Sequence, residues 1–218
     1  MLRTVSIVPT ILTNNKVEYR AQIERINIFT RRVQIDITDG VFAKNETIDI
    51  TNVWWPKGWV TDLHLMVRKP SDNLDTILKL MPSLCILHAE ADEDLLPIFD
   101  TLKEKGIRTG VALLPSTYPG NVKNYIDAVD HVLIFAGQLG EQGGAADMMQ
   151  MEKIALIRNM KPELEIGWDG GVNLKNVRAL AHADLDVINV GSAISQAEDP
   201  AHMFDELVAE IDKNGVVL

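Results

Sequence analysis

The sequence predicts a single α/β domain over residues 1–218, folded as a closed (β/α)8 barrel of the TIM type. Three observations lead to this expectation. Eight short apolar runs alternate with amphipathic stretches along the chain. The chain has 218 residues, enough for one sizeable domain. No linker, low-complexity tract or block of charge divides it. An open, doubly wound sheet is the alternative arrangement of the same elements.

The eight apolar runs are the predicted strands, and they lie at residues 6–12, 33–37, 60–65, 84–87, 110–114, 131–135, 165–168 and 186–190. The clearest helix spans residues 92–105, with Asp92 as its N-cap and Gly106 as its stop. Its apolar face carries Leu95, Leu96, Ile98, Phe99 and Leu102. Further helices are expected at 148–160, from the N-cap Asn173 to residue 183, and at 200–213.

Charge and composition indicate which kinds of partner and which cellular location to expect. The net charge is −10, and no basic stripe is present, so we expect no nucleic-acid partner. No apolar run is long enough to span a membrane, and no signal peptide is evident, so we expect no membrane partner. The single cysteine, Cys85, lies in an apolar run and is expected to be buried, which favours a reducing, cytoplasmic location.

Three polar side chains come at the ends of predicted strands: Asp36, His64 and Asp169. Because strand ends converge on one site in a closed barrel, these residues are expected to meet. Two carboxylates and an imidazole suit a divalent metal ion, and they also suit proton transfer. Strand alternation places Gln34 and Thr38 on the same, inward face as Asp36.

The remaining histidines and the tryptophans are less specific signals. His88 follows a strand end and either supports the site from behind or faces the substrate, whereas His131, His182 and His202 read as surface or helix residues. Asp39, beside Gly40, reads as a loop aspartate whose carboxylate is capped or solvated. Three tryptophans within residues 54–59 either cover the core or contribute in part to a subunit interface.

Glycine-rich loops follow the last three predicted strands. Glycine lets backbone N–H groups approach an anion closely, and the loops after strands 7 and 8 are the usual phosphate site of such barrels. An acidic chain needs such local donors for an anionic substrate. The predicted phosphate-binding residues are Gly143, Gly144, Gly170, Gly171, Gly191 and Ser192.

Taken in order, the site segments resemble the motifs of the ribulose-phosphate 3-epimerase family from about residue 6 to residue 194. The matching segments are residues 9–13, 36–42, 64–67, 88–90, 140–144, 169–173 and 191–194. The resemblance implies a metal-binding barrel that interconverts D-ribulose 5-phosphate and D-xylulose 5-phosphate. It implies that Asp36 and Asp169 act as acid and base at C3 and bind the metal with His64. It also implies that Met66 lines the floor of the site, that Thr10 stands where the family has a serine, and that the protein is a homo-oligomer.

The sequence departs from the family pattern at three places. Gln34 stands where the family has its first metal-binding histidine. An amide oxygen is a poor ligand for zinc or iron, so we expect that the metal binds weakly, is a harder ion such as manganese or magnesium, or is absent. Phe135 replaces a methionine, and the loop at residues 138–144 lacks the family's Asn-Pro-Gly-Phe-Gly-Gly segment. Glu141 adds a negative charge to this loop, where the phosphate is expected.

Two other functions stay open at this point. The first is another enolisation or aldol-type reaction, or another phosphorylated sugar, on a barrel of the same ancestry. The second is a non-catalytic protein that binds sugar phosphates. The related decarboxylases and hexulose-phosphate synthases carry an Asp-x-Lys-x-x-Asp pattern, and residues 36–39 contain no lysine, so these activities are not favoured.

Overall fold

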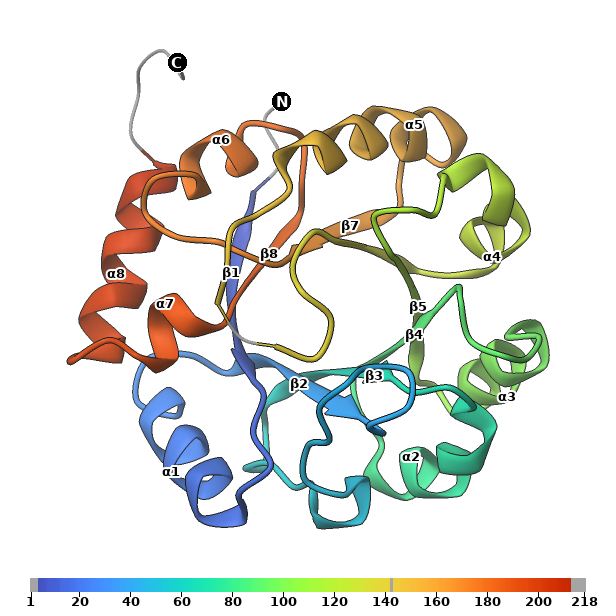
Figure 1. Ribbon diagram of the computed structural model, residues 1–218, viewed down its shortest axis with the longest axis horizontal. Coiled ribbons are helices and arrows are strands. Elements are labelled where there is room, and N and C mark those ends of the chain that lie inside the picture. Colours follow the sequence, from blue (N-terminus) through green and yellow to red (C-terminus); the bar gives the residue numbers. More distant parts are fainter. Residues whose placement is uncertain (1–3, 142, 213–218) are drawn as a thin grey trace.

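The computed structural model is a closed barrel of parallel strands surrounded by helices (Figure 1). It describes residues 4–141 and 143–212. Each strand pairs with the next one in sequence, and β1 closes the barrel by pairing with β8. This topology confirms the predicted (β/α)8 barrel and excludes an open sheet.

The strands follow the predicted apolar runs closely. They are β1 (Ser6–Ile11), β2 (Arg32–Thr38), β3 (Val60–Met66), β4 (Leu84–His88), β5 (Arg108–Leu113), β6 (His131–Phe135), β7 (Glu165–Asp169) and β8 (Val187–Val190). Because the helices outside and the side chains inside both cover these strands, nearly every strand residue is buried.

The helices occupy the outer ring. They are α1 (Lys16–Ile26), α2 (Leu74–Leu80), α3 (Leu96–Glu104), α4 (Lys123–Ala128), α5 (Glu152–Met160), α6 (Val177–Ala181), α7 (Ser192–Ser195) and α8 (Pro200–Ile211). Short 3-10 turns are η1 (Ile50–Asn52), η2 (Pro70–Asn73), η3 (Pro119–Val122) and η4 (Met148–Met151). Between β2 and β3 the chain forms only η1 in place of an α-helix.

Two predicted helix starts are wrong, and both lie too early in the chain. Helix α3 begins at Leu96 instead of Asp92, whose carboxylate pairs with Arg68 and whose N–H donates to the Arg68 carbonyl. Pro97, which favours a first helical turn, marks the start of this helix. The predicted stop is confirmed, since Gly106 follows the helix at a φ of +78°.

Helix α6 likewise begins at Val177, four residues after the predicted cap Asn173. The Asn173 side chain accepts a hydrogen bond from the Lys175 N–H and so closes a turn ahead of the helix. Helix α8 begins at Pro200, as predicted, and is capped by the Asp199 carboxylate, which accepts from the Ala201 N–H. Its predicted end at Lys213 lies outside the described residues.

The interior of the barrel is layered. The end formed by the strand N-termini holds an ionic cluster, in which Glu165 binds Arg32, Arg108 and His131 and Arg32 also binds Asp62. Above this cluster lies a small apolar layer of Leu84, Ile86, Ala112 and Leu133. The polar site residues occupy the next layer, at the strand C-termini. A separate, larger core fills the space between the strands and the helices.

His131 is buried at 1% exposure, which overturns its predicted surface position. The side chain points into the barrel because Gly167 leaves room for it. A Cβ atom at Gly167 would lie 2.8 Å from the imidazole ring. His182 and His202 are exposed, as predicted.

The other single-residue expectations are met in part. Cys85 is buried, and burial raises the pKa of its thiol to about 12. Trp59 belongs to the core, and its indole N–H donates to Asn27. Trp54 is 41% exposed, and its role in a subunit interface stays a prediction. Among the described helices, none combines the length and the apolar character that crossing a membrane requires.

Candidate functional site

The predicted metal and acid–base residues meet at the C-terminal end of the barrel. Asp36 on β2 is the register partner of His64 on β3, and Asp169 ends β7 across the barrel mouth. The His64 Nδ1 atom lies 3.0 Å from Asp36 Oδ1 and 3.8 Å from Asp169 Oδ2. The three ligand atoms all lie within 4.8 Å of one another. This cluster could hold one metal ion.

The side chain of Gln34, two residues before Asp36 on β2, belongs to the same cluster. Its amide Nε2 donates to Asp36 Oδ1 at 2.9 Å and to Asp169 Oδ2 at 2.6 Å, and it lies 3.5 Å from His64 Nδ1. The amide oxygen Oε1 is buried and has no hydrogen-bond partner. Rotating the amide by half a turn exchanges the positions of Nε2 and Oε1. Oε1 then faces the cluster as a fourth ligand atom, beside those of Asp36, His64 and Asp169.

The charge of Asp36 acts on Asp169. Burial and, next, the nearby charge of Asp36 raise the pKa of Asp169 to about 7, against the opposing effects of His64 and the Gln34 amide. A carboxyl group in this range can hold a proton near neutral pH and release it again. That property is what an acid–base catalyst needs.

His88 lies directly behind His64. Both rings are completely buried, and the two Nε2 atoms are 2.9 Å apart. On its other side, His88 Nδ1 lies 3.3 Å from Glu90 Oε2. Burial lowers the pKa of His88 to about 4, so the ring is neutral at physiological pH. His88 does not line the cavity, and of the two roles considered for it, its place favours support of the site from behind.

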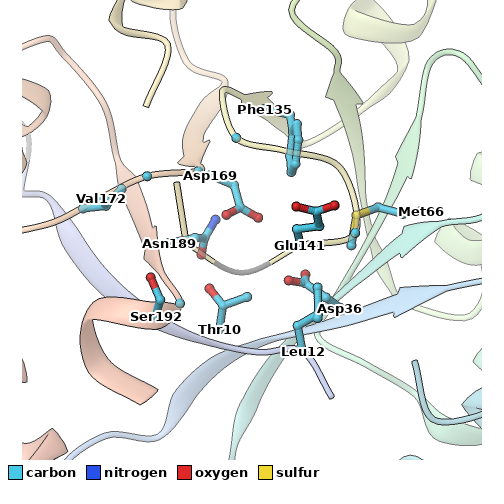
Figure 2. Close-up of a pocket in the computed structure, with 16 residues that line it drawn as sticks. Thr10, Leu12, Asp36, Met66, Phe135, Glu141, Asp169, Val172, Asn189 and Ser192 are labelled. Carbon is cyan, nitrogen blue, oxygen red and sulfur yellow. The ribbon is translucent and has the colours of Figure 1, made fainter. Parts of the chain in front are cut away.

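A cavity opens above the cluster, and its walls come from the loops after β1, β6, β7 and β8 (Figure 2). Asp36 and Asp169 point into it from opposite sides. Of the predicted substrate residues, Thr10 and Met66 line it. The other side-chain walls are Leu12, Phe135, Glu141, Val172, Asn189 and Ser192. None of its described lining residues is basic.

Most of the predicted phosphate residues also line this cavity, namely Gly143, Gly170, Gly171, Gly191 and Ser192. Gly144 does not. Gly171 also has a structural reason to be glycine, because its φ is +66° and a Cβ there would lie 2.1 Å from the backbone nitrogen of Ala146. The close packing of the loops after β6 and β7 therefore depends on this residue.

Asn189 is the main cavity residue that the sequence reasoning missed. It is the register partner of Asp169, it is 2% exposed, and its Oδ1 has no hydrogen-bond partner. The Thr10 hydroxyl is buried without a partner as well. Unsatisfied polar atoms at a cavity wall are typical of groups that bind a ligand or water. An asparagine inside the apolar run 186–190 was the available signal.

Asp39 is a structural loop residue, as predicted. Its carboxylate accepts backbone N–H bonds from Val41, Phe42 and Arg68. Burial alone would raise the pKa of Asp39, but these N–H donors outweigh that effect and lower it. The carboxylate holds the loop after β2 in place next to the site.

A sequence profile of the ribulose-phosphate 3 epimerase family matches residues 6–195. The chain belongs to this family. The fission yeast (Schizosaccharomyces pombe) protein named ribulose-phosphate 3-epimerase is 28% identical over 208 residues, or 92% of this chain and 91% of that protein. The cytoplasmic isoform of Oryza sativa subsp. japonica is 29% identical over 94% of both chains. The Bacillus subtilis protein of the same name is 30% identical over 80% of this chain and 84% of its own length.

The family confirms the predicted class of enzyme, an isomerase of the epimerase type. Solved structures share the barrel at much lower identity. A 3-hexulose-6-phosphate synthase matches with a TM-score of 0.65 at 14% identity, covering 95% of this chain and 99% of its own. Tryptophan synthase from Mycobacterium tuberculosis matches with a TM-score of 0.71 at 12% identity, covering 97% and 94%. These likenesses show the fold alone.

Proposed function

We propose that the protein is a metal-assisted epimerase that interconverts D-ribulose 5-phosphate and D-xylulose 5-phosphate. The observation that carries the proposal is the pair Asp36 and Asp169, which face one another across a single cavity beside His64. Inversion at a carbon atom needs one group to remove a proton from one face and another group to supply a proton to the opposite face. The two aspartates stand in that relation.

In this mechanism, the substrate lies between the two aspartates with C3 in the middle. One aspartate removes the C3 proton, and the other returns a proton from the far side. The reverse reaction exchanges their roles. Asp169, with a pKa raised to about 7, can hold the proton that is to be delivered. The apolar wall of Met66 and Phe135 limits the access of water during the exchange.

The donor set fits a divalent cation. Asp36, His64 and Asp169 would hold it, with the Gln34 amide oxygen as a fourth donor after its rotation. The Gln34 amide lies 2.9 Å from Asp36 Oδ1 and 2.6 Å from Asp169 Oδ2, so its oxygen would face the same ion. When bound, the ion would stabilise the negative charge that develops on the substrate oxygens. Three oxygens and one nitrogen favour manganese or magnesium over zinc or iron.

For the phosphate we propose the loops that carry Gly143, Gly170, Gly171, Gly191 and Ser192. Backbone N–H groups there would supply the hydrogen bonds, since the described cavity residues include no basic side chain. Glu141 lines the same cavity and works against a dianion (Figure 2). The Glu141 carboxylate favours a second candidate function, the epimerisation of a sugar that carries less negative charge at the end near Glu141.

We also propose a cytoplasmic location and a homo-oligomeric assembly. The location is supported by the cytoplasmic isoform among the relatives and by the buried, unpaired Cys85. The assembly is supported by the partly exposed Trp54 on the outside of the barrel. Light scattering of the purified protein tests it, because a monomer at micromolar concentration would refute it.

The experiment that tests the proposed reaction is exchange of the C3 proton of D-ribulose 5-phosphate in deuterated solvent. Formation of D-xylulose 5-phosphate is followed in the same sample. Deuterium at C3 together with the new epimer supports the proposal. If neither appears, whereas another ketose or its phosphate ester is epimerised, the second candidate takes its place.

A further inference from the structure

A row of polar side chains, buried except for the partly exposed Glu90, leads from Asp36 away from the cavity to Glu90. Asp36 Oδ1 lies 3.0 Å from His64 Nδ1, His64 Nε2 lies 2.9 Å from His88 Nε2, and His88 Nδ1 lies 3.3 Å from Glu90 Oε2. We call these four residues the relay. Neither the metal ligation nor the proton transfer described above uses its last two members.

The surroundings of the relay fix its geometry. Both histidines have no solvent exposure, and the ring of Phe42 packs 4.9 Å from His88. The ring nitrogens of His88 therefore depend on the relay for their hydrogen bonds, whereas His64 Nδ1 also lies 3.5 Å from Gln34 Nε2. At the far end, Glu90 Oε1 accepts the Leu114 N–H at 2.9 Å, which leaves Oε2 to face His88.

The number of hydrogen atoms on the two imidazole rings limits how many contacts of the relay can be hydrogen bonds. Its three contacts each need one hydrogen atom between the two partners, and the carboxylates at the two ends are acceptors. Two neutral imidazole rings supply only two hydrogens. One contact is therefore left with two acceptors facing each other, and that contact needs a cation or a hydrogen donor from outside the relay.

The carboxylates at the two ends compete for a ring hydrogen, and the Gln34 amide, which already donates to Asp36 Oδ1, favours Glu90. When Glu90 takes the ring hydrogen on His88 Nδ1, His88 Nε2 carries a lone pair and accepts the hydrogen on His64 Nε2. His64 Nδ1 is then left with its lone pair toward Asp36. This is the nitrogen that belongs to the Asp36, His64 and Asp169 cluster.

We propose that Glu90 is a positioning residue that acts through His88 to hold the hydrogen of His64 on Nε2 and so keeps Nδ1 free to bind a divalent cation. The inference rests on the proposed function only in taking His64 as a metal ligand. Partners of this kind behind a ligating histidine usually affect metal affinity by about 10- to 100-fold.

The test compares wild-type protein with Glu90→Leu and His88→Phe. Long-range 1H–15N NMR of the metal-free protein reports which ring nitrogen of His64 carries hydrogen, and titration with Mn2+ followed by EPR gives the Kd. We expect hydrogen on His64 Nε2 in the wild type. In both variants it should move to Nδ1, toward Asp36, and the Kd for Mn2+ should rise about 10- to 100-fold.

His88→Phe leaves the hydrogen bond between Glu90 and the Leu114 N–H in place. It therefore distinguishes the effect of breaking the relay from the effect of releasing the loop after β5. If Glu90→Leu does not fold, this second variant gives the same answer. The matched control is Glu165→Gln, which alters another buried histidine–glutamate contact at the opposite end of the barrel. It should change neither the His64 tautomer nor the Kd.

A wild-type His64 with hydrogen on Nδ1 and none on Nε2 would overturn the proposal, and so would variants whose tautomer and Kd match the wild type. The proposed function can fail independently. If the wild type binds no Mn2+ or catalyses no epimerisation, the tautomer measurement alone decides whether the relay exists.

Discussion

Asp36 and His64 face each other in the register of β2 and β3, with Asp36 Oδ1 3.0 Å from His64 Nδ1. The pairing follows directly from strand register, because both side chains point into the barrel at the same height. It places a carboxylate that lines the cavity directly beside a fully buried imidazole.

Replacing Asp169 by asparagine should remove one of the two proton-transfer groups while keeping its shape. We expect exchange of the substrate C3 proton to fall by about 100- to 10,000-fold. The melting temperature should stay the same or rise, since the repulsion with Asp36 is relieved. The control is Asp127→Asn on the exposed face of α4, and exchange that survives in Asp169→Asn would refute the assigned role.

Gln34→His tests the departure from the family pattern. An imidazole at this position adds a nitrogen ligand beside Asp36 and His64, so the affinity for Zn2+ should rise by about tenfold or more. Calorimetric titration measures this change. Gln34→Leu is the companion variant, which removes both amide atoms and should weaken binding of every divalent ion. Equal affinities in all three proteins would place the metal elsewhere.

Glu141→Gln should improve binding of a phosphorylated substrate. The carboxylate lines the cavity and repels a dianion, so its removal should lower KM by about threefold to tenfold and leave kcat nearly unchanged. The effect should shrink at high salt, because the charge is exposed. Steady-state kinetics at two ionic strengths check this, with Glu104→Gln on α3 as the control. A higher KM would instead mean that Glu141 binds the sugar.

Glu165 should contribute to stability in a pH-dependent way. Burial would raise its pKa, but hydrogen bonding and the charges of His131, Arg32 and Arg108 outweigh burial and lower the pKa well below its ordinary value. A lowered folded pKa means that the contribution is complete above the unfolded value of about 4.3 and is lost as the pH falls below it.

The corresponding variant is Glu165→Gln. At pH 7.5 it should lower the free energy of unfolding by about 2 kcal/mol, between the values typical of exposed and of buried ion pairs. The difference from wild type should shrink at pH 3.5, where Glu165 takes up a proton in the unfolded chain but keeps its charge in the folded protein. Urea unfolding at the two pH values measures it, and a difference that grows in acid would contradict the assignment.

The barrel was predictable from the sequence because parallel strands buried on both faces appear as apolar runs, and their alternation with helices leaves few architectures. The convergence of Asp36, His64 and Asp169 followed from their place at strand ends. Helix starts were less predictable. Asp92 and Asn173 are good caps by composition, but the chain uses them in an ion pair and in a turn.

Side-chain roles that depend on neighbours distant in sequence could not be read from the chain. His131 is buried only because Gly167, on the adjacent strand, lacks a side chain. Asn189 joins the cavity through its register with Asp169. The bridging position of the Gln34 amide depends on two carboxylates from different strands, and no local pattern encodes it.

The most direct test of the proposed reaction is a single assay of metal content and C3 proton exchange, with purified protein and D-ribulose 5-phosphate in deuterated solvent. We expect about one equivalent of a divalent metal after loading with Mn2+, together with deuterium at C3 and formation of D-xylulose 5-phosphate. Protein that takes up no metal and leaves the C3 proton unexchanged would contradict it.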